Sequence, residues 1–157
     1  MWPIRGADAV VFAAGSNGGA RAITDAIDVR AVERCLVAAE SADVRRFVLV
    51  SVSPEAWRER HLSDDEDYYF AAKKTVEVHV TRSALDWLIL RPSLLTDGPG
   101  EGRVFLGPAA EHHQISRHDV ADVLAELLRH PTLSRRILEL DRGSTPIIEA
   151  VGACVPA

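Results

Sequence analysis

The stretch Phe47-Val-Leu-Val50 decides the fold class, because all four of its residues are apolar. A strand with one solvated face alternates apolar and polar residues, whereas a strand covered on both faces is apolar throughout. Similar runs lie upstream at Ala9–Ala14 and downstream at Trp87–Leu90, and a fourth, Ile137–Leu140, contains one glutamate. The sequence therefore predicts about four strands, at least three of them inside a sheet.

Helical patterns separate these runs. Their apolar spacing places helices at Thr24–Ser41, Asp67–Ser83, Arg117–His130 and about Pro146–Val151. Strands that alternate with helices form a parallel sheet with right-handed crossovers, so the predicted class is α/β. Ser116 is expected to cap the third helix, and Asp119 to reach back to it.

Composition limits the chain to one core. With 157 residues, 47% of them hydrophobic, residues 1–157 are expected to form a single domain. The net charge of −5 and the scattered basic residues argue against a nucleic-acid partner. The sequence shows no secretory leader and no apolar stretch of membrane-spanning length, and Cys35 and Cys154 form no metal-ligand spacing. We expect a cytoplasmic protein with reduced thiols and no membrane association.

Two segments without a periodic pattern follow strand ends, where the ligands of open α/β sheets bind. They are Pro54–Glu66 and Thr96–Gln114. The acidic run Asp64–Asp67 precedes the Tyr69 helix, where acidic residues complement the helix dipole, and we expect it to form the solvated edge of a lid. Three histidines are close together in sequence, but the H-E-x-x-H pattern and neighbouring thiolates are missing. We therefore predict exposed imidazoles and no metal site at His112, His113 and His118.

Tyr69 and Lys73 form the sharpest chemical pattern. A spacing of four residues puts the phenol and the ammonium on one helical face, which continues through Val76 and Val80 and is therefore buried. A phenol beside a fixed ammonium has a lowered pKa, which suits proton transfer to a carbonyl oxygen. The alternative is that the tyrosine only packs and that Lys73 pairs with Glu77.

Three further residues have two possible roles each. Ser51 and Ser53 follow the second strand, where a hydroxyl could hold a substrate carbonyl or could simply end the strand. Asp28 lies on the apolar side of its helix, where it could complement the helix dipole or line a site. The loop Gly15-Ser-Asn-Gly-Gly19 occupies the position of a phosphate loop without its spacing, so we predict only a close backbone approach there.

The chain resembles the short-chain dehydrogenase/reductase superfamily, and within it the atypical NmrA-like NAD(P)-binding branch. The resemblance extends from about Gly6 to Val151 and rests on five stretches: Gly6–Ser16, Arg46–Ser51, Tyr69-x-x-x-Lys73, Leu85–Pro92 and Ile115–Ala121. It implies a Rossmann-type sheet, NAD(P) as cofactor, and an oxidoreductase that reduces a small carbonyl compound.

The resemblance also implies residue roles. Tyr69 would be the acid/base, and Lys73 would bind the nicotinamide ribose and lower the pKa of the tyrosine. Ser51 or Ser53 would orient the carbonyl, and Asp28 would replace a helix asparagine that supports a proton relay. The remaining cofactor contacts would be Ala14, Gly15 and Ser16 under the adenosine, and Arg91, Pro92 and Ser93 beside the nicotinamide.

The sequence departs from that family at its start. The family opens with a strand, a G-x-x-G-x-x-G turn and a further βαβ stretch, whereas residues 1–157 correspond to the C-terminal part of such a domain. Because the pyrophosphate binds at the first helix, we expect NAD(P) binding to be lost unless another chain supplies that part. The residues that choose between NADH and NADPH belong to it as well.

This departure exposes a strand. Ala9–Ala14 carries no charge and no proline, so it suits the interior of a sheet, yet here it would be an edge with unpaired backbone groups. The expected partner is the same strand of a second copy, in a homodimer. Three interpretations remain open: a reductase, a non-catalytic dimeric binding or scaffold module, and a truncated member of the family.

Overall fold

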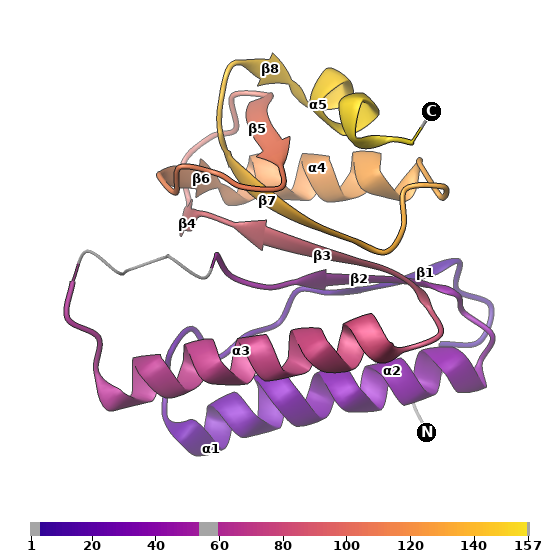
Figure 1. The fold of residues 1–157 in the computed structure, drawn as a ribbon, viewed down its shortest axis with the longest axis vertical. Coiled ribbons are helices and arrows are strands. Elements are labelled where there is room, and N and C mark those ends of the chain that lie inside the picture. The colour runs from indigo at the N-terminus through magenta and orange to yellow at the C-terminus, as the bar shows by residue number, and fades with distance from the viewer. Residues whose placement is uncertain (1–3, 54–59, 157) are drawn as a thin grey trace.

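The central sheet has six strands in the order β1-β2-β3-β7-β5-β8 (Figure 1). The computed structural model describes residues 4–53 and 60–156. The strands are β1 (Ala9–Phe12), β2 (Arg46–Val50), β3 (Asp86–Pro92), β5 (Arg103–Gly107), β7 (Arg136–Arg142) and β8 (Thr145–Pro146). Two more strands, β4 (Leu94–Thr96) and β6 (Gln114–Ser116), form a separate parallel pair.

The four expected strands are present as β1, β2, β3 and β7, and they are parallel, which confirms the α/β class. The strand count is higher than expected because β5 pairs antiparallel with β7, and β8 pairs antiparallel with β5. The prediction that Thr96–Gln114 is irregular is therefore wrong over β5 and β6. Strand β6 has only three residues, and β5 lies between Gly98–Gly102 and Gly107-Pro108, whose glycines and prolines are typical of loops.

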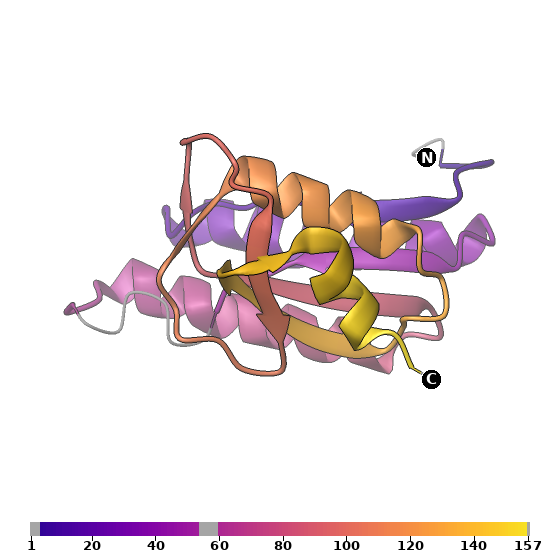
Figure 2. The ribbon, with the colours of Figure 1, turned by 90° about the horizontal axis from the view of Figure 1, so that it is seen from above.

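Helices cover both faces of the sheet. A continuous helical segment runs through α1 (Arg21–Thr24), the π-helical turn η1 (Asp25–Ala31) and α2 (Val32–Ser41). The other helices are α3 (Asp64–Arg82), α4 (Arg117–Leu128) and α5 (Ile147–Cys154). Helices α2 and α3 lie on one face, and α4 and α5 lie on the other (Figures 1 and 2). Within the described residues, every helix is too short or too polar to cross a membrane.

Helix α3 begins earlier than its apolar pattern predicts, because a capping box sets its start. The Ser63 hydroxyl accepts the Glu66 N–H, and the Glu66 carboxylate accepts the Ser63 N–H at 2.9 Å. The acidic run Asp64–Asp67 therefore forms the first helical turn, where it complements the dipole as expected. Of the expected loop Pro54–Glu66, residues 54–59 lie outside the described residues.

Helix α4 is capped differently from the prediction. The Ser116 hydroxyl accepts the His118 N–H at 3.1 Å, as expected. Asp119, however, accepts the backbone N–H groups of Glu101 and Gly102 at 3.0 and 2.8 Å, so the prediction that it reaches back to Ser116 is wrong. Its carboxylate ties the loop before β5 to the helix, a contact between residues too distant in sequence for a capping pattern to indicate.

Each face of the sheet has its own apolar core. Alternate residues of the central strands point to opposite faces. Val48 and Leu88 pack with α4 and α5, while Leu49 and Ile89 pack with α2 and α3. Burial on both faces explains why β2 and β3 are apolar throughout. It leaves the C-terminal strand ends as the place where polar side chains gather.

Candidate active site

A pocket of about 160 Å³ lies where β2 and β3 end, beside the first half of α3. Ser51, Tyr69, Pro92 and Ser93 line it, together with Asn17 and Arg117 among others. The parallel strands end at the same edge of the sheet, on the left of Figure 1, so residues far apart in sequence meet there. Of the expected site residues, four therefore share one pocket.

A buried ion pair lies behind this pocket. The Lys73 ammonium is 2.8 Å from an oxygen of Asp28, and the two side chains are 4% and 0% exposed. The other Asp28 oxygen accepts the Ser16 N–H at 2.9 Å. A Cβ at Gly15 would lie 3.2 Å from the Asp28 carboxylate, so glycine allows this loop to approach the pair. The pair thus joins the loop after β1 to α3.

Two of the simpler sequence interpretations are wrong. Lys73 does not pair with Glu77, because Glu77 binds Arg91 through two contacts of 3.0 and 2.6 Å. Asp28 does more than complement a dipole, because it neutralises a buried ammonium. It lies in the π-helical turn η1, and such wide turns occur frequently at functional sites.

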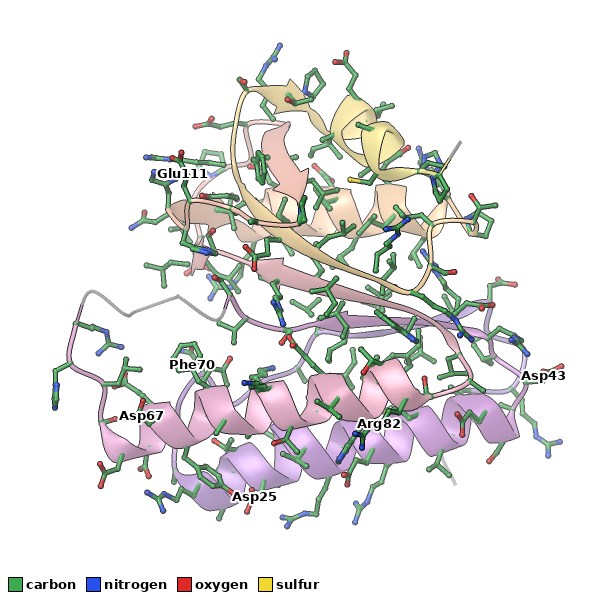
Figure 3. The ribbon with its side chains drawn as sticks, in the orientation of Figure 1. Asp25, Asp43, Asp67, Phe70, Arg82 and Glu111 are labelled. Carbon is green, nitrogen blue, oxygen red and sulfur yellow. The ribbon has the colours of Figure 1, made fainter. Side chains whose placement is uncertain are left out.

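The environment of Tyr69 differs from the expectation of a lowered pKa. Burial raises the pKa of Tyr69, and the negative charge of Asp28 raises it further. The Lys73 ammonium lies 5.5 Å from the centre of the tyrosine ring, and Asp28 balances its charge. The phenol therefore remains protonated at neutral pH and can donate a hydrogen bond into the pocket. Phe70, labelled in Figure 3, packs edge-on against its ring.

The two serines after β2 have different surroundings. The Ser51 hydroxyl is buried, lines the pocket, and has no hydrogen-bond partner among the described residues. An unpartnered hydroxyl in a pocket is suited to a polar group of a ligand. Ser53 instead lies 2.6 Å from Nδ1 of His112, whose Nε2 is 3.7 Å from Glu139. Ser51, and not Ser53, faces the same space as Tyr69.

Only some of the other expected cofactor residues line the pocket. Pro92 and Ser93 line the pocket, whereas Arg91 is held by Glu77 and, at 3.6 Å, by Glu139. Ala14 is exposed in the loop after β1. The sequence analysis did not identify Asn17 and Arg117 as residues that line the pocket. The backbone of Asn17 has a φ of 53°, which asparagine tolerates better than most residues.

The histidine loop is more ordered than expected. The prediction of exposed imidazoles is wrong for His112, whose side chain is mostly buried against Ser53 and Glu139. His113 donates to Asp141 through both its backbone N–H and its ring Nδ1, each at 2.9 Å. Within residues 4–53 and 60–156, no group of three histidine, cysteine or acidic side chains is arranged to hold a metal ion.

The residues present fit one end of a dinucleotide. Tyr69, Ser51 and the nearby buried Lys73 offer hydroxyl and ammonium groups to a nicotinamide ribose and an adjacent substrate. The loop after β1 is less suited to a pyrophosphate, because the Ser16 N–H already binds Asp28. The described site therefore matches the nicotinamide half better than the phosphate half.

Comparison with known proteins agrees with this geometry. Residues 3–131 match a protein family described as NAD(P)H-binding. The chain belongs to this family. The expected relationship to the atypical NmrA-like branch of the short-chain dehydrogenases/reductases, with a Rossmann-type sheet, is thereby confirmed.

Several relatives are similar over most of the chain. A Bacillus subtilis protein described as an uncharacterized sugar epimerase, YhfK, is 32% identical over 94% of this chain and 69% of its own length. A solved protein of Bacillus halodurans described as an NAD-dependent epimerase/dehydratase has 32% identity and a TM-score of 0.83, covering 93% of this chain and 69% of that one. The oxidoreductase ylbE of Lactococcus lactis has 26% identity and a TM-score of 0.78, covering 96% and 68%. The chain thus spans about two thirds of each relative.

Proposed function

We propose that this chain carries the catalytic part of an NAD(P)-dependent oxidoreductase that reduces a small carbonyl compound. One observation carries the proposal: the Ser51 hydroxyl, which has no hydrogen-bond partner in the described part of the chain, and the Tyr69 phenol line the same pocket, next to a buried Lys73–Asp28 pair. Its fold and its family support a nicotinamide cofactor. We further propose that residues 1–157 correspond to the C-terminal part of a dinucleotide-binding domain.

Each residue would contribute through its position. A bound nicotinamide cofactor would supply hydride. Ser51 would donate a hydrogen bond to the carbonyl oxygen, and Tyr69, kept protonated by burial, would donate the proton to that oxygen. Lys73 would bind ribose hydroxyls while Asp28 holds its ammonium in place. Ser53 would act as a positioning residue through His112.

The test begins with calorimetric titration of the purified chain by NADPH and then NADH. Micromolar affinity supports the proposal and justifies assays with carbonyl substrates. Tyr69→Phe should then abolish turnover and leave the fold intact, while Tyr68→Phe should retain activity, because Tyr68 points to Asp25 outside the pocket. No binding at millimolar cofactor, or full turnover in Tyr69→Phe, would overturn it.

A non-catalytic binding or scaffold module is the second candidate. It is favoured by the Ser16 N–H, which already binds Asp28 and is therefore not available to a phosphate. In this role the pocket would bind a small molecule without turnover. Binding of a ligand at Ser51 without any NAD(P) binding would support this candidate over the reductase.

We also propose a homodimer that forms through β1. In the described structure β1 is an edge strand that pairs with β2, and Val11 is 38% exposed on it. Light scattering at micromolar concentration should give twice the chain mass, and Val11→Lys should give the monomer, because a charge at an edge strand opposes pairing. A monomeric wild type would refute this assembly.

Free thiols at Cys35 and Cys154 support the proposed cytoplasmic location.

A further inference from the structure

A second pocket, of about 350 Å³, lies beside β5 and β7. Its walls are the loop that leads from β5 to β6, where Glu111 is labelled in Figure 3, and the turn that leads from β7 to β8. Phe105, His113 and Asp141 line it. Neither the proposed reductase chemistry nor the core uses these three side chains.

His113 and Asp141 form a dyad in this pocket. Asp141 is 2% exposed and accepts the His113 backbone N–H, the His113 Nδ1–H and the Arg142 N–H, at 2.9, 2.9 and 2.8 Å. Burial would raise the pKa of Asp141, but the hydrogen bonds from His113 and Arg142 bring it below its usual value. The carboxylate has few lone pairs left for a ligand, so it does not suit an amine.

The dyad instead presents an imidazole nitrogen. Nδ1 of His113 donates to the Asp141 carboxylate, which can only accept, so Nε2 is the ring nitrogen left for a ligand. The His113 side chain is 40% exposed, and the carboxylate of Glu111, itself 89% exposed, lies 3.8 Å from Nε2. Arg142 is the other charged residue of the pocket. The position thus offers a ligand hydroxyl a hydrogen-bond partner at Nε2.

Phe105 provides a flat apolar surface next to the dyad. It is the cross-strand partner of Asp141, so both side chains stand on the same face of the sheet. The Phe105 ring lies over Gly107, where a Cβ would be 3.1 Å from the ring. Phe105 nevertheless stays 42% exposed. An aromatic ring that is supported on one side and exposed on the other suits stacking by a planar ligand.

The two pockets adjoin. Ser93 lines the Tyr69 pocket, and its backbone N–H binds the carbonyl of Leu140 on β7 at 2.8 Å. The next residue of β7, Asp141, lines the second pocket. A ligand group held in the second pocket therefore lies next to the proposed reaction site.

We infer that the pocket of Phe105, His113 and Asp141 binds a planar ring that carries a hydroxyl group. The ring stacks on Phe105, and the hydroxyl forms its hydrogen bond with Nε2 of His113. We further infer that this ring is the end of the reductase substrate that the protein recognises, so that the substrate is a hydroxylated aromatic carbonyl compound. This second step rests on the proposed function. The binding itself does not depend on a cofactor.

The experiment is a titration of the ¹⁵N-labelled full chain with 4-hydroxybenzaldehyde, and with benzaldehyde as the comparison that lacks the hydroxyl. We expect shifts of the amide signals of β5 and of residues 109–113, and at least tenfold weaker binding of benzaldehyde. His113→Gln should weaken 4-hydroxybenzaldehyde binding about tenfold. His79→Gln, a matched change of a partly exposed histidine that pairs with Glu33, should leave it unchanged.

Phe105→Leu keeps the apolar volume and removes the flat ring, so it should also weaken binding, with an unchanged far-UV circular dichroism spectrum. The inference is overturned if 4-hydroxybenzaldehyde fails to bind at millimolar concentration, or if it shifts only amide signals outside β5 and residues 109–113. It is also overturned if neither variant weakens binding of the probe. A chain that binds the probe but not NADPH would keep this inference and refute the reductase.

Discussion

Replacing Asp28 by asparagine tests the central electrostatic feature of the site. The amide keeps an oxygen that can accept the Ser16 N–H, so the substitution removes mainly the charge opposite Lys73. At 2.8 Å and an effective dielectric constant of about 20, the attraction amounts to about 6 kcal/mol. Burial of each ion costs several kcal/mol, so the intact pair contributes little net free energy, but a lone buried ammonium is costly.

Asp28→Asn should therefore lower the free energy of unfolding by about 3–5 kcal/mol. For a chain of this length, that corresponds to a decrease of roughly 6–20 °C in Tm. Urea unfolding followed by circular dichroism measures the change. Combining it with Lys73→Met should restore much of the loss, because the double variant buries no unpaired charge.

An exposed pair provides the control. Arg21 and Asp65 are 3.3 Å apart with side chains 56% and 50% exposed, so Asp65→Asn should cost less than about 1 kcal/mol. A cost below about 1 kcal/mol for Asp28→Asn would refute the reasoning. So would a double variant whose loss equals the sum of the two single losses, because it would show that the charges do not interact.

Two further predictions concern the C-terminal half. Gly143→Ala should destabilise the chain by about 1–3 kcal/mol in urea unfolding, because its Cβ would lie 2.4 Å from the backbone of Val104. Gly152→Ala, with open space around it in α5, should instead be neutral or stabilising. The lowered pKa of Asp141 means that its contribution is present above the unfolded pKa, about 4, and is lost as the pH falls through the folded value. The stability difference between wild type and Asp141→Asn should therefore shrink on acidification, and a difference that grows would contradict this.

Much of the site was visible in local patterns. A spacing of four residues on one helix is enough to bring Tyr69 and Lys73 to one face, and the structure has that arrangement. The partner of Lys73 could not be predicted, because Asp28 is 45 residues away and no local rule links η1 to α3. The predicted direction of the Tyr69 pKa failed because burial of the phenol, which depends on tertiary packing, raises this pKa, and the charge of the distant Asp28 raises it further.

The sequence by itself determined the central strands and the face of each long helix. Continuous apolar runs and helical spacing are local consequences of burial, so Phe47-Val-Leu-Val50 indicates a two-sided strand wherever its neighbours lie. Only the tertiary structure decided that β5 runs antiparallel to β7 and that Phe105 stands beside Asp141. Strand pairing and ion pairing join residues that are distant in sequence, and their free energy depends on distances that exist only after the chain has folded.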